Sequence, residues 1–569
     1  MNFVEKLGVK DCSWQAFERM LSRLLTCEGY ENVRLVGGSG DHGADVIATK
    51  YHKRWLVQAK QWKKPVGISV LNETLKAMKD YQAAIPVIAA SNGFESDLKK
   101  QQVVLQSQNI PLQLWDETVL LQRASKLEKD KTTNIKEPRE YQENAIVNIV
   151  QPFFDQYVNR SLIVLATGLG KTFVAAEAMR RICAIKPIRV LVLAHTNSLV
   201  YQLEKSFWPF LTPEQSTFVW NGYEHPDMSR GYDFVFACID TVYESLQKNI
   251  TYDFDVIIID ECHHAGSSTY RKLIDFYDAG KQNGPFLLGL TATPWRPDEN
   301  DIIDIFGKPR ISIDMVYGMK HGFLTNVDYR MYTDNIDWNS LRTFDGQLFS
   351  PRQINRTLFI NQWDDAVVTE LQMAWYEQKN PRAIVFCGTI DHALKMRDRI
   401  NALGFCNAAA IFSGSRDSAE EQPFYERNRI MCDFSDGIVN VVCAVDVFNE
   451  GIDVPDVNII VFQRVTHSRR IFIQQLGRGL RISNEKDKVI VLDFVSDIRR
   501  FAAGIDLKDR LSAREATRVD IPNKVTFRKV GGEDPQTERF LREWLDDVAS
   551  IENANEDSSI LKFPPQIIS

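Results

Sequence analysis

The fold of this chain is decided by the stretch Leu162-Ile163-Val164-Leu165-Ala166-Thr167-Gly168-Leu169-Gly170-Lys171-Thr172. Its first part is a run of branched apolar residues, which is typical of a buried parallel strand. The glycines that follow let backbone N–H groups turn inward around phosphate oxygens. Residues 173–177 then resume as a helix, whose N-terminal dipole favours an anion. The stretch therefore predicts a strand, a phosphate-binding loop and a helix.

The side chains that end this loop suit a magnesium nucleotide. Lys171 is placed to reach the β- and γ-phosphates, and Thr172 to bind Mg²⁺ through its hydroxyl. The strict G-x-x-x-x-G-K-[ST] pattern fails, because Leu165 stands where the first glycine would fall. The alternative is a glycine-rich turn with a surface lysine, but the predicted strand before the loop and the predicted helix after it argue against this alternative.

Upstream, residues 138–142 read Pro-Arg-Glu-Tyr-Gln. Gln142, together with Arg139, lies just ahead of the nucleotide strand, where a glutamine amide can hydrogen-bond the edge of an adenine. A simple helix start is the competing interpretation of the same residues.

After the loop, apolar strands alternate with helices, which predicts a parallel sheet covered on both faces. The predicted strands are 190–194, 234–238, 256–260 and 286–290. Ligands gather at the carboxyl ends of such strands, and there the chain carries Asp260, Glu261 and His263. The aspartate would complete the Mg²⁺ shell, and the glutamate would orient or deprotonate the attacking water. A solvated acidic loop is the alternative.

A second α/β unit is predicted from strands 383–388, 440–446, 458–462 and 489–493, and it has no phosphate-binding loop of its own. Its polar residues lie in 449–455 and 474–481 instead. Arg478 and Arg481 are one helical turn apart, so they project from one face and suit the γ-phosphate held by the other unit. Such arginine fingers contribute on the order of 10³-fold or more to hydrolysis.

Residues 1–125 predict a smaller α/β unit with neighbouring strands at 46–48 and 55–59. Asp45 opens one strand, and Gln58 and Lys60 end the other, so their polar ends can converge. Metal-assisted phosphodiester cleavage needs an acidic oxygen ligand, a second ligand and a cation near the attacking water. These three residues supply that set.

At these positions the segment resembles the Mrr-type restriction endonucleases of the PD-(D/E)xK nuclease fold. The resemblance rests on Phe17-Glu18, on the Gly40-to-Asp45 loop, on Val57-Gln58-x-Lys60 and on the later strand 86–94. It implies that Asp45 is a metal ligand, that Gln58 takes the place of the acidic ligand and that Lys60 is catalytic. Glu18 would add a carboxylate from a helix. An inactive nuclease fold kept for DNA docking is the alternative.

Residues 138–494 resemble the superfamily-two helicase core, because its motifs occur in the family's order. The form A-x-T-G-x-G-K-T at the loop belongs to this family, and residues 448–453 with 474–481 look most like the DEAH-type ATPases related to restriction motor subunits. The resemblance implies a nucleotide site with a base, Glu261, and fingers, Arg478 and Arg481. Its other expected residues are Arg139, Gln142, Thr167, Gly168, Gly170, Lys171, Thr172, Asp260, His263, Gly451, Asp453 and Gln474.

Size and composition agree with a multidomain protein. At 569 residues, the rule of about 150 residues per domain gives roughly four domains. We expect a cytoplasmic location, because no apolar run approaches the roughly 18 residues that a membrane span needs. Nine cysteines without a C-x-x-C pair suggest reduced thiols. The net charge is −7, but residues 1–123 carry 16 Lys+Arg against 13 Asp+Glu, which leaves a local surplus for phosphates.

The predicted architecture is α/β throughout. We expect a PD-(D/E)xK nuclease-like domain at 1–122, a linker at 123–136, RecA-like lobes at 137–330 and 376–500 with a connection at 331–375 between them, and a small, mainly helical region at 501–569.

The function predicted from the sequence is an ATP- and Mg²⁺-dependent DNA translocase or helicase fused to an endonuclease, acting in prokaryotic restriction of foreign DNA with possible further defence subunits. Two alternatives stay open. One is a repair or remodelling helicase whose residues 1–122 only bind DNA, and the other is an ATP-switched nucleic-acid sensor that recruits a partner.

Overall fold

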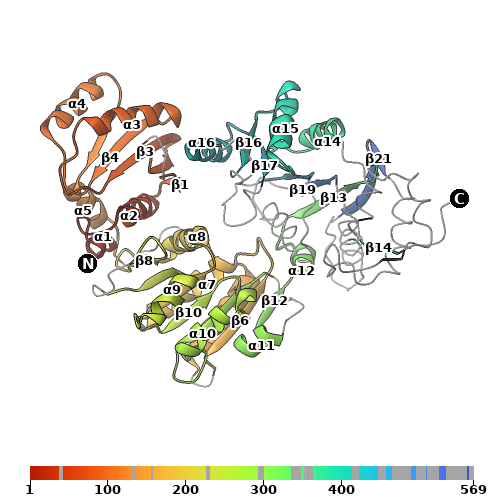
Figure 1. The fold of residues 1–569 in the computed structure, drawn as a ribbon, viewed down its shortest axis with the longest axis horizontal. Helices are drawn as coiled ribbons and strands as arrows, with labels where there is room; N and C mark the ends of the chain where they lie inside the picture. The colour runs from red at the N-terminus through yellow and green to blue at the C-terminus, as the bar shows by residue number, and fades with distance from the viewer. Residues whose placement is uncertain are drawn as a thin grey trace. The chain divides into compact units, whose positions relative to one another are not determined.

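The structure is a computed structural model. It describes residues 1–37, 43–129, 132, 136–155, 158–225, 231–292, 300–334, 348–350, 353, 363–412, 422–445, 457–463, 488–494, 508, 524–533 and 561–562. Its contacts divide the chain into two compact units. One comprises Met1–Leu165, Gly170–Ser312 and Pro423–Arg429, and the other comprises Ala166–Leu169, Ile313–Gln422 and Ile430–Ser569. Many of the elements are labelled in Figure 1.

The first domain is built on a five-stranded sheet with the order β1-β2-β3-β4-β5. The strands are β1 (Glu31–Leu35), β2 (Val46–Lys50), β3 (Lys53–Lys60), β4 (Ile85–Ala90) and β5 (Gln113–Trp115). The helices are α1 (Phe3–Leu7), α2 (Trp14–Cys27), α3 (Ser69–Asp80), α4 (Ser96–Ser107) and α5 (Glu117–Ser125). The pairs β1–β2 and β2–β3 are antiparallel, whereas β3–β4 and β4–β5 are parallel. Apolar residues of α2 pack on one face of the sheet, and those of α3 and α4 on the other.

The first lobe contains a seven-stranded sheet with the order β12-β6-β11-β10-β7-β9-β8. The strands are β6 (Arg160–Leu165), β7 (Val190–Ala194), β8 (Thr217–Trp220), β9 (Phe234–Cys238), β10 (Val256–Ile259), β11 (Phe286–Thr291) and β12 (Ile311–Ile313). The helices are α6 (Glu140–Phe154), α7 (Lys171–Ile185), α8 (Asn197–Phe207), α9 (Ile239–Gln247), α10 (Ser268–Phe276) and α11 (Asn300–Phe306), with short 3₁₀ turns at Trp208–Phe210 and Cys262–His264.

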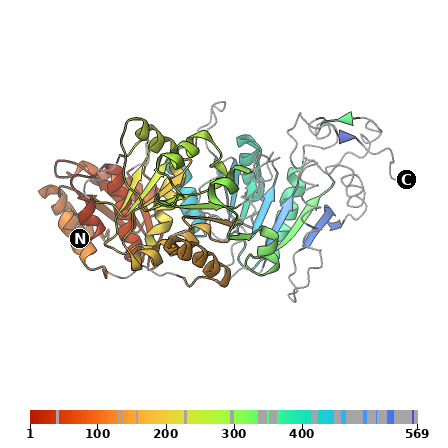
Figure 2. The ribbon, with the colours of Figure 1, turned by 90° about the horizontal axis from the view of Figure 1, so that it is seen from below.

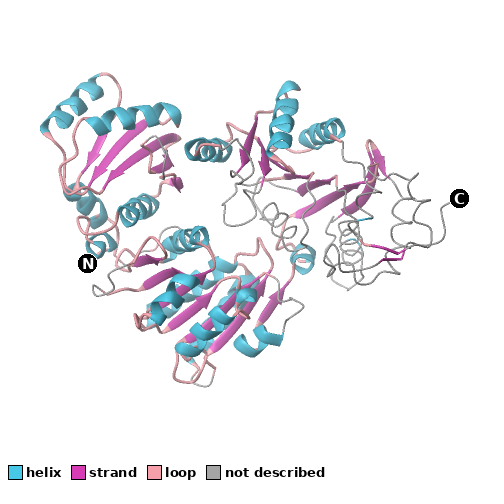
Figure 3. Ribbon diagram, viewed as in Figure 1, coloured by secondary structure: helices cyan, strands magenta, loops and turns pink. Residues whose placement is uncertain are grey.

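This sheet is apolar on both faces, as predicted for a covered parallel sheet. The five pairings from β6 through β8 are parallel. Ile257 and Ile259 of β10 pack into one apolar cluster with α9 and α10, while Ile258 between them is buried on the opposite face. Helices flank the strands on both sides, as Figures 2 and 3 show. The two-sided burial explains why these strands are continuous apolar runs and not alternating ones.

The second lobe contains an eight-stranded sheet with the order β16-β17-β15-β18-β19-β13-β20-β21. The strands are β13 (Asn326–Tyr332), β15 (Ala383–Phe386), β16 (Ala408–Phe412), β17 (Val441–Val445), β18 (Ile459–Phe462), β19 (Lys488–Asp493), β20 (Lys524–Lys529) and β21 (Gly532–Glu533). A separate pair joins β14 (Leu348–Phe349) to β22 (Leu561–Lys562). The helices are α12 (Met315–Lys320), α14 (Asp364–Tyr376), α15 (Ile390–Ala402) and α16 (Phe424–Ser435). Every pairing from β16 to β20 is parallel, so the predicted fold class is confirmed.

Several predicted domain boundaries shift. Helix α5 continues to Ser125, inside the expected linker, because Leu120 and Ala124 are buried in the nuclease core. Strand β13 belongs to the second lobe, not the first, since it pairs with β19 and β20. Helix α14 packs in the core of the second lobe, so part of the expected connection is lobe structure.

The C-terminal region also differs from the expectation of a mainly helical segment. In the described part of 501–569, residues 524–533 form β20 and β21, and β20 extends the lobe sheet in parallel with β13. Apart from residues 508 and 561–562, the rest of this expected helical region lies outside the described residues. Among the helices that are described, none has the length and apolar character needed to cross a membrane.

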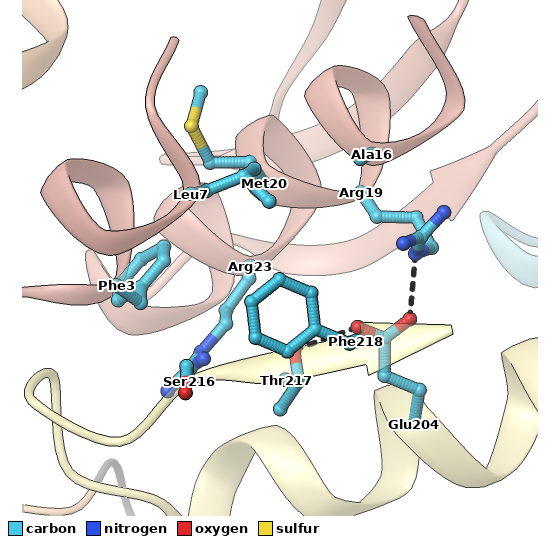
Figure 4. Close-up of a pocket in the computed structure, with 10 residues that line it drawn as sticks. All are labelled: Phe3, Leu7, Ala16, Arg19, Met20, Arg23, Glu204, Ser216, Thr217 and Phe218. Carbon is cyan, nitrogen blue, oxygen red and sulfur yellow. Dashed lines mark hydrogen bonds and ion pairs between the residues drawn. The ribbon is translucent and has the colours of Figure 1, made fainter. Parts of the chain in front are cut away.

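The nuclease domain and the first lobe belong to the same compact unit, and a buried charge cluster lies between them (Figure 4). Arg19 of α2 is fully enclosed, with Nε 2.8 Å from Glu204 Oε2 and Nη1 2.5 Å from Glu224 Oε1. Burial lowers the pKa of Arg19, but the two carboxylates outweigh it and leave the pKa raised. Arg23, one turn on, donates to the carbonyl of Thr212 at 3.1 Å. Two buried guanidinium groups thus anchor α2 to the lobe.

Candidate active sites

The phosphate-binding loop joins β6 to α7 as the sequence predicts. Gly168 and Gly170 have φ values of +90° and +84°, in the region that favours glycine, and α7 begins at Lys171. A Cβ atom on Gly170 would lie 2.8 Å from Nε2 of Gln142, closer than such atoms approach. The glycine is therefore required both by its backbone angle and by its neighbour.

Gln142 lies against this loop and is buried. It is the third residue of α6, and its Oε1 accepts a hydrogen bond of 3.0 Å from the N–H of Arg139, the residue that caps the helix. The two interpretations of this segment are therefore compatible, because the same glutamine caps a helix and adjoins the nucleotide loop. Its contact with adenine stays a prediction.

Asp260 and Glu261 follow β10 at the carboxyl edge of the sheet. Glu261 has the left-handed angles φ 47° and ψ 50°, a strained conformation for a residue with a side chain. This conformation brings its Oε1 to 3.8 Å from Nζ of Lys171. The predicted phosphate ligand and the predicted base therefore meet in the folded chain.

Asp260 has the environment of a metal ligand. Its carboxylate is buried, and among the described residues Oδ1 has no hydrogen-bond partner. Burial, reinforced by the charge of Glu261, raises its pKa to about 7. A buried carboxylate oxygen without a partner is costly unless a cation occupies the site, so Asp260 fits a divalent metal that arrives with a nucleotide. The role of Thr172 as a second ligand stays a prediction.

His263 connects two strand ends. Its Nδ1 lies 3.2 Å from Oε2 of Glu261 and 3.2 Å from Oγ1 of Thr291, the last residue of β11. One imidazole nitrogen thus lies within 3.2 Å of both the Glu261 carboxylate and the Thr291 hydroxyl. Thr291 starts the sequence Thr291-Ala292-Thr293-Pro294, of which Thr293 and Pro294 lie outside the described residues.

The site residues predicted in the second lobe also fall outside the described part of the chain. These residues are Gly451, Asp453, Gln474, Arg478 and Arg481. The roles of the first three in the nucleotide site and of the two arginines as fingers stay predictions.

In the nuclease domain, three of the four predicted residues line one pocket. Its walls are formed by Trp14, Glu18, Asp45, Ala59, Lys60, Gln61 and Trp62. A Cβ on Gly37 would lie 2.9 Å from Glu18 Oε2 and 3.1 Å from Asp45 Oδ1, so the two carboxylates converge beside this glycine. The other oxygen of Asp45 accepts a 2.6 Å hydrogen bond from the Ala59 N–H, which fixes the carboxylate. Two convergent carboxylates with a lysine nearby fit a divalent cation that assists phosphodiester cleavage.

Gln58 is placed differently. Its side chain is fully buried, its Oε1 accepts from the hydroxyl of Thr74, and its Nε2 donates to Oε2 of Glu73 at 3.0 Å. Nζ of Lys60 lies 3.7 Å from the same oxygen of Glu73. Gln58 thus adjoins the pocket without lining it, and its role as a metal ligand stays a prediction.

Glu73 is a site residue that the sequence reasoning missed. It lies in α3, which follows the pocket strands, and nothing in its spacing marks it out from other exposed helical acids. Only folding brings its carboxylate to both Gln58 and Lys60. Its carboxylate therefore lies beside the lysine that lines the pocket.

Three family models match successive parts of the chain. Restriction endonuclease (the Mrr catalytic domain) matches residues 9–124, type III restriction enzyme, res subunit, matches 135–296, and the helicase conserved C-terminal domain matches 365–483. The chain is 25% identical over 474 residues to the type I restriction enzyme EcoAI endonuclease subunit of Escherichia coli. The matched region covers 74% of this chain and 55% of that subunit. It thus spans a little over half of that relative's length.

Two further similarities agree. The chain is 25% identical over 368 residues to the DNA 3'-5' translocase XPB2 of Sulfurisphaera tokodaii, covering 58% of this chain and 76% of that protein. Its fold is similar to the DNA-bound ATP-dependent Type ISP restriction-modification enzyme LlaBIII, with a TM-score of 0.51, 17% identity, and coverage of 93% of this chain and 41% of that one. The chain thus carries an N-terminal domain similar to Mrr-type restriction endonucleases, followed by two RecA-like parallel-sheet lobes whose sequences are similar to those of restriction-enzyme and helicase subunits.

Proposed function

We propose that this protein is an ATP-driven DNA translocase or helicase that carries its own Mg²⁺-dependent endonuclease and acts in prokaryotic restriction of foreign DNA. The observation that carries the proposal is the presence of two separate sites of the right chemistry in one chain. Lys171, Glu261 and His263 meet around the nucleotide loop, and Glu18 and Asp45 converge in the nuclease pocket. The EcoAI relative is named as a subunit, so the proposal includes partner subunits.

The motor site suggests how ATP is hydrolysed. Mg²⁺, when bound with ATP, neutralises phosphate charge. Lys171 exchanges its contact with Glu261 for the β- and γ-phosphates, which frees the Glu261 carboxylate. Glu261 then accepts a proton from the attacking water, whose oxygen bonds to the γ-phosphorus while the bond from that phosphorus to ADP breaks. His263, which contacts both Glu261 and Thr291, links the new position of the Glu261 carboxylate to Thr291.

The nuclease site acts on a phosphodiester in a related way. A divalent metal there supplies positive charge next to the phosphate. Glu18 and Asp45 would hold the metal, and Lys60 stabilises the charge that develops on the phosphate oxygens. Water adds to phosphorus, one ester P–O bond breaks, and the strand is left with one phosphate end and one hydroxyl end.

Two pairs of variants test the proposal. Lys171→Ala and Glu261→Gln should each lower DNA-stimulated ATP hydrolysis by about 10²-fold or more, since a general base alone contributes that much. Asp45→Ala and Lys60→Ala should abolish Mg²⁺-dependent DNA cutting and leave ATP hydrolysis unchanged. Purified protein is incubated with duplex, forked and single-stranded DNA, and phosphate release and strand cutting are scored together. Normal turnover in Glu261→Gln would refute the motor site, and cutting by Asp45→Ala would refute the nuclease site.

A further inference from the structure

Two tryptophans are exposed at the mouth of the nuclease pocket. Trp14 has 53% and Trp62 43% of its surface accessible, and both line the pocket that holds Glu18, Asp45 and Lys60. Large apolar side chains that gather on a functional surface usually mark a contact with a ligand. Neither the helicase chemistry nor the metal site explains why two indole rings stand here.

Both tryptophans are held on fixed backbone. Trp14 is the first residue of α2, where Ser13 caps the helix by accepting from the Ala16 N–H at 3.1 Å. The carbonyl of Trp62 accepts hydrogen bonds from Ser91 Oγ at 3.0 Å and Asn92 Nδ2 at 2.6 Å. A ring whose backbone is already ordered loses little freedom on binding, so it is a preorganised stacking surface.

Positive charge lies beside Trp62. Nζ of Lys60 lies 5.7 Å from the centre of the Trp62 ring, and the next residues along the chain, Lys63 and Lys64, are exposed. Aromatic faces beside a run of lysines are the usual means of binding a single nucleic-acid strand, because each base can stack while the lysines neutralise its phosphates. The acidic residues that line the pocket are Glu18 and Asp45, whose charge a bound metal would offset, and Lys60 lies 3.7 Å from the nearby Glu73.

We propose that the nuclease pocket takes single-stranded DNA, with unpaired bases stacked on Trp14 and Trp62 while the phosphodiester lies at Glu18, Asp45 and Lys60. In a duplex the base faces are covered by their neighbours, so only an unpaired strand can make these contacts. The inference deepens the proposed function and rests on it, because a motor that separates strands supplies this substrate.

Binding is tested in the full-length chain with Asp45→Asn, which removes the metal carboxylate so that the DNA stays intact. The probe is a short DNA strand that contains 2-aminopurine, whose fluorescence falls when the base stacks. Trp14→Ala and Trp62→Ala should each weaken binding about fivefold or more and relieve the quenching, while Trp62→Phe keeps most of both. Tyr51→Ala is the matched control, because Tyr51 is 82% exposed in the same domain, beside Lys50, at the turn between β2 and β3.

A paired duplex of the same sequence should compete poorly with the probe. Equal binding and quenching by the parent and by both alanine variants would overturn the inference, as would a duplex that competes as well as the single strand. Cutting by the protein with native Asp45 separates this inference from the proposed nuclease. If it cuts paired and unpaired DNA alike and the tryptophan variants leave KM unchanged, the strand preference is wrong and the nuclease stands. If nothing is cut while the quenching depends on both rings, the nuclease proposal is wrong and the strand site stands.

Discussion

At the scale of single residues, the motor site depends on burial as much as on identity. Asp260 and Glu261 are adjacent acids, but only Asp260 is buried with an unpartnered oxygen, while Glu261 contacts Lys171 and His263. Burial disfavours the charge on Asp260 until a cation arrives. The two acids therefore have different tasks although they are neighbours in the sequence.

This difference predicts how nucleotide binding responds to pH. Because the pKa of Asp260 is raised to about 7, a proton competes with the metal below that pH. The Mg²⁺ concentration needed for half-maximal binding of fluorescent ADP should rise as pH falls from about 8 to about 6, by at most about tenfold per unit below the pKa. Asp260→Asn has no carboxyl group to titrate at this position. Its affinity for Mg²⁺ should be weaker, and the Mg²⁺ concentration for half-maximal ADP binding should not change with pH. A parent protein whose Mg²⁺ requirement is equally flat would contradict this assignment.

Gln58 offers a second test at this scale. Gln58→Glu removes the N–H donor to Glu73 and places a carboxyl group at the buried position 58, in contact with the exposed carboxylate of Glu73. The unfolding free energy of the nuclease domain should fall by about 1–3 kcal/mol, because the hydrogen bond is lost and the new carboxyl group at position 58 is buried beside a second acid. Calorimetry measures this as a shift of the thermal unfolding transition of the nuclease domain.

The swap Gln58→Glu with Glu73→Gln is the matched control, since it restores one donor and one acceptor to the pair. It should recover most of the lost stability. If Gln58→Glu alone were stable and cut DNA faster, residue 58 would be a direct metal ligand and the hydrogen-bonding role described above would be secondary.

At the scale of elements, α2 serves the nuclease pocket and the first lobe at once. Trp14 and Glu18 lie at the pocket, while Arg19 and Arg23 point into the lobe (Figure 4). A helix places successive residues about 100° apart, so Glu18 and Arg19 necessarily face different surroundings. Because Glu18 and Arg19 are neighbours on one helix, a shift of Arg19 relative to the lobe would also shift the Glu18 carboxylate in the pocket.

Breaking this anchor should be costly. Glu204→Ala leaves the enclosed Arg19 guanidinium with one carboxylate fewer, and loss of a buried partner costs about 3–5 kcal/mol. We expect a lower first unfolding transition by calorimetry and faster hydrogen exchange in α2. Lys100→Ala is the control, because the Lys100–Asp97 pair on α4 is exposed and is worth about 0.5 kcal/mol or less. Equal effects of the two changes would show that the cluster does not anchor α2.

At the scale of the whole molecule, the nuclease is packed on the first lobe and is more than a domain attached by a tether. Lys6 pairs with Asp233 at 3.0 Å, and the N–H of Phe3 donates to the carbonyl of Pro213 at 2.7 Å, in addition to the contacts of Arg19 and Arg23. The charged anchor makes the pairing of these two surfaces specific.

Cutting the chain between the two domains should therefore leave them together. With a specific protease site inserted between residues 130 and 135, the cleaved halves should elute as one species in size-exclusion chromatography, because the buried contacts outlast the covalent link. Adding Glu204→Ala should favour their separation. Halves of the parent protein that separate immediately on cleavage would mean that the linker alone holds the domains.

Much of this molecule follows from local sequence. The predicted strand before the phosphate loop and those at 190–194, 234–238 and 256–259 are confirmed. Continuous apolar runs between helices are typical of parallel strands that are buried on both faces. The missed elements carry weaker local signals. Strand β13 lies between predicted domains, and its seven residues form a strand because β19 and β20 pair with it on either side.

The sequence by itself determined which chemistry is present: a glycine loop with Lys171 and Thr172, an acidic pair after a strand, and Asp45 with Lys60 at the ends of two others. Local backbone preferences and apolar periodicity are enough for that. Only the tertiary structure decided that Glu73 meets Gln58 and Lys60, that Arg19 joins Glu204 and Glu224, and that Trp14 and Trp62 share one pocket. Burial and distance between residues far apart in the chain set these contacts, and neither quantity exists until the core has formed.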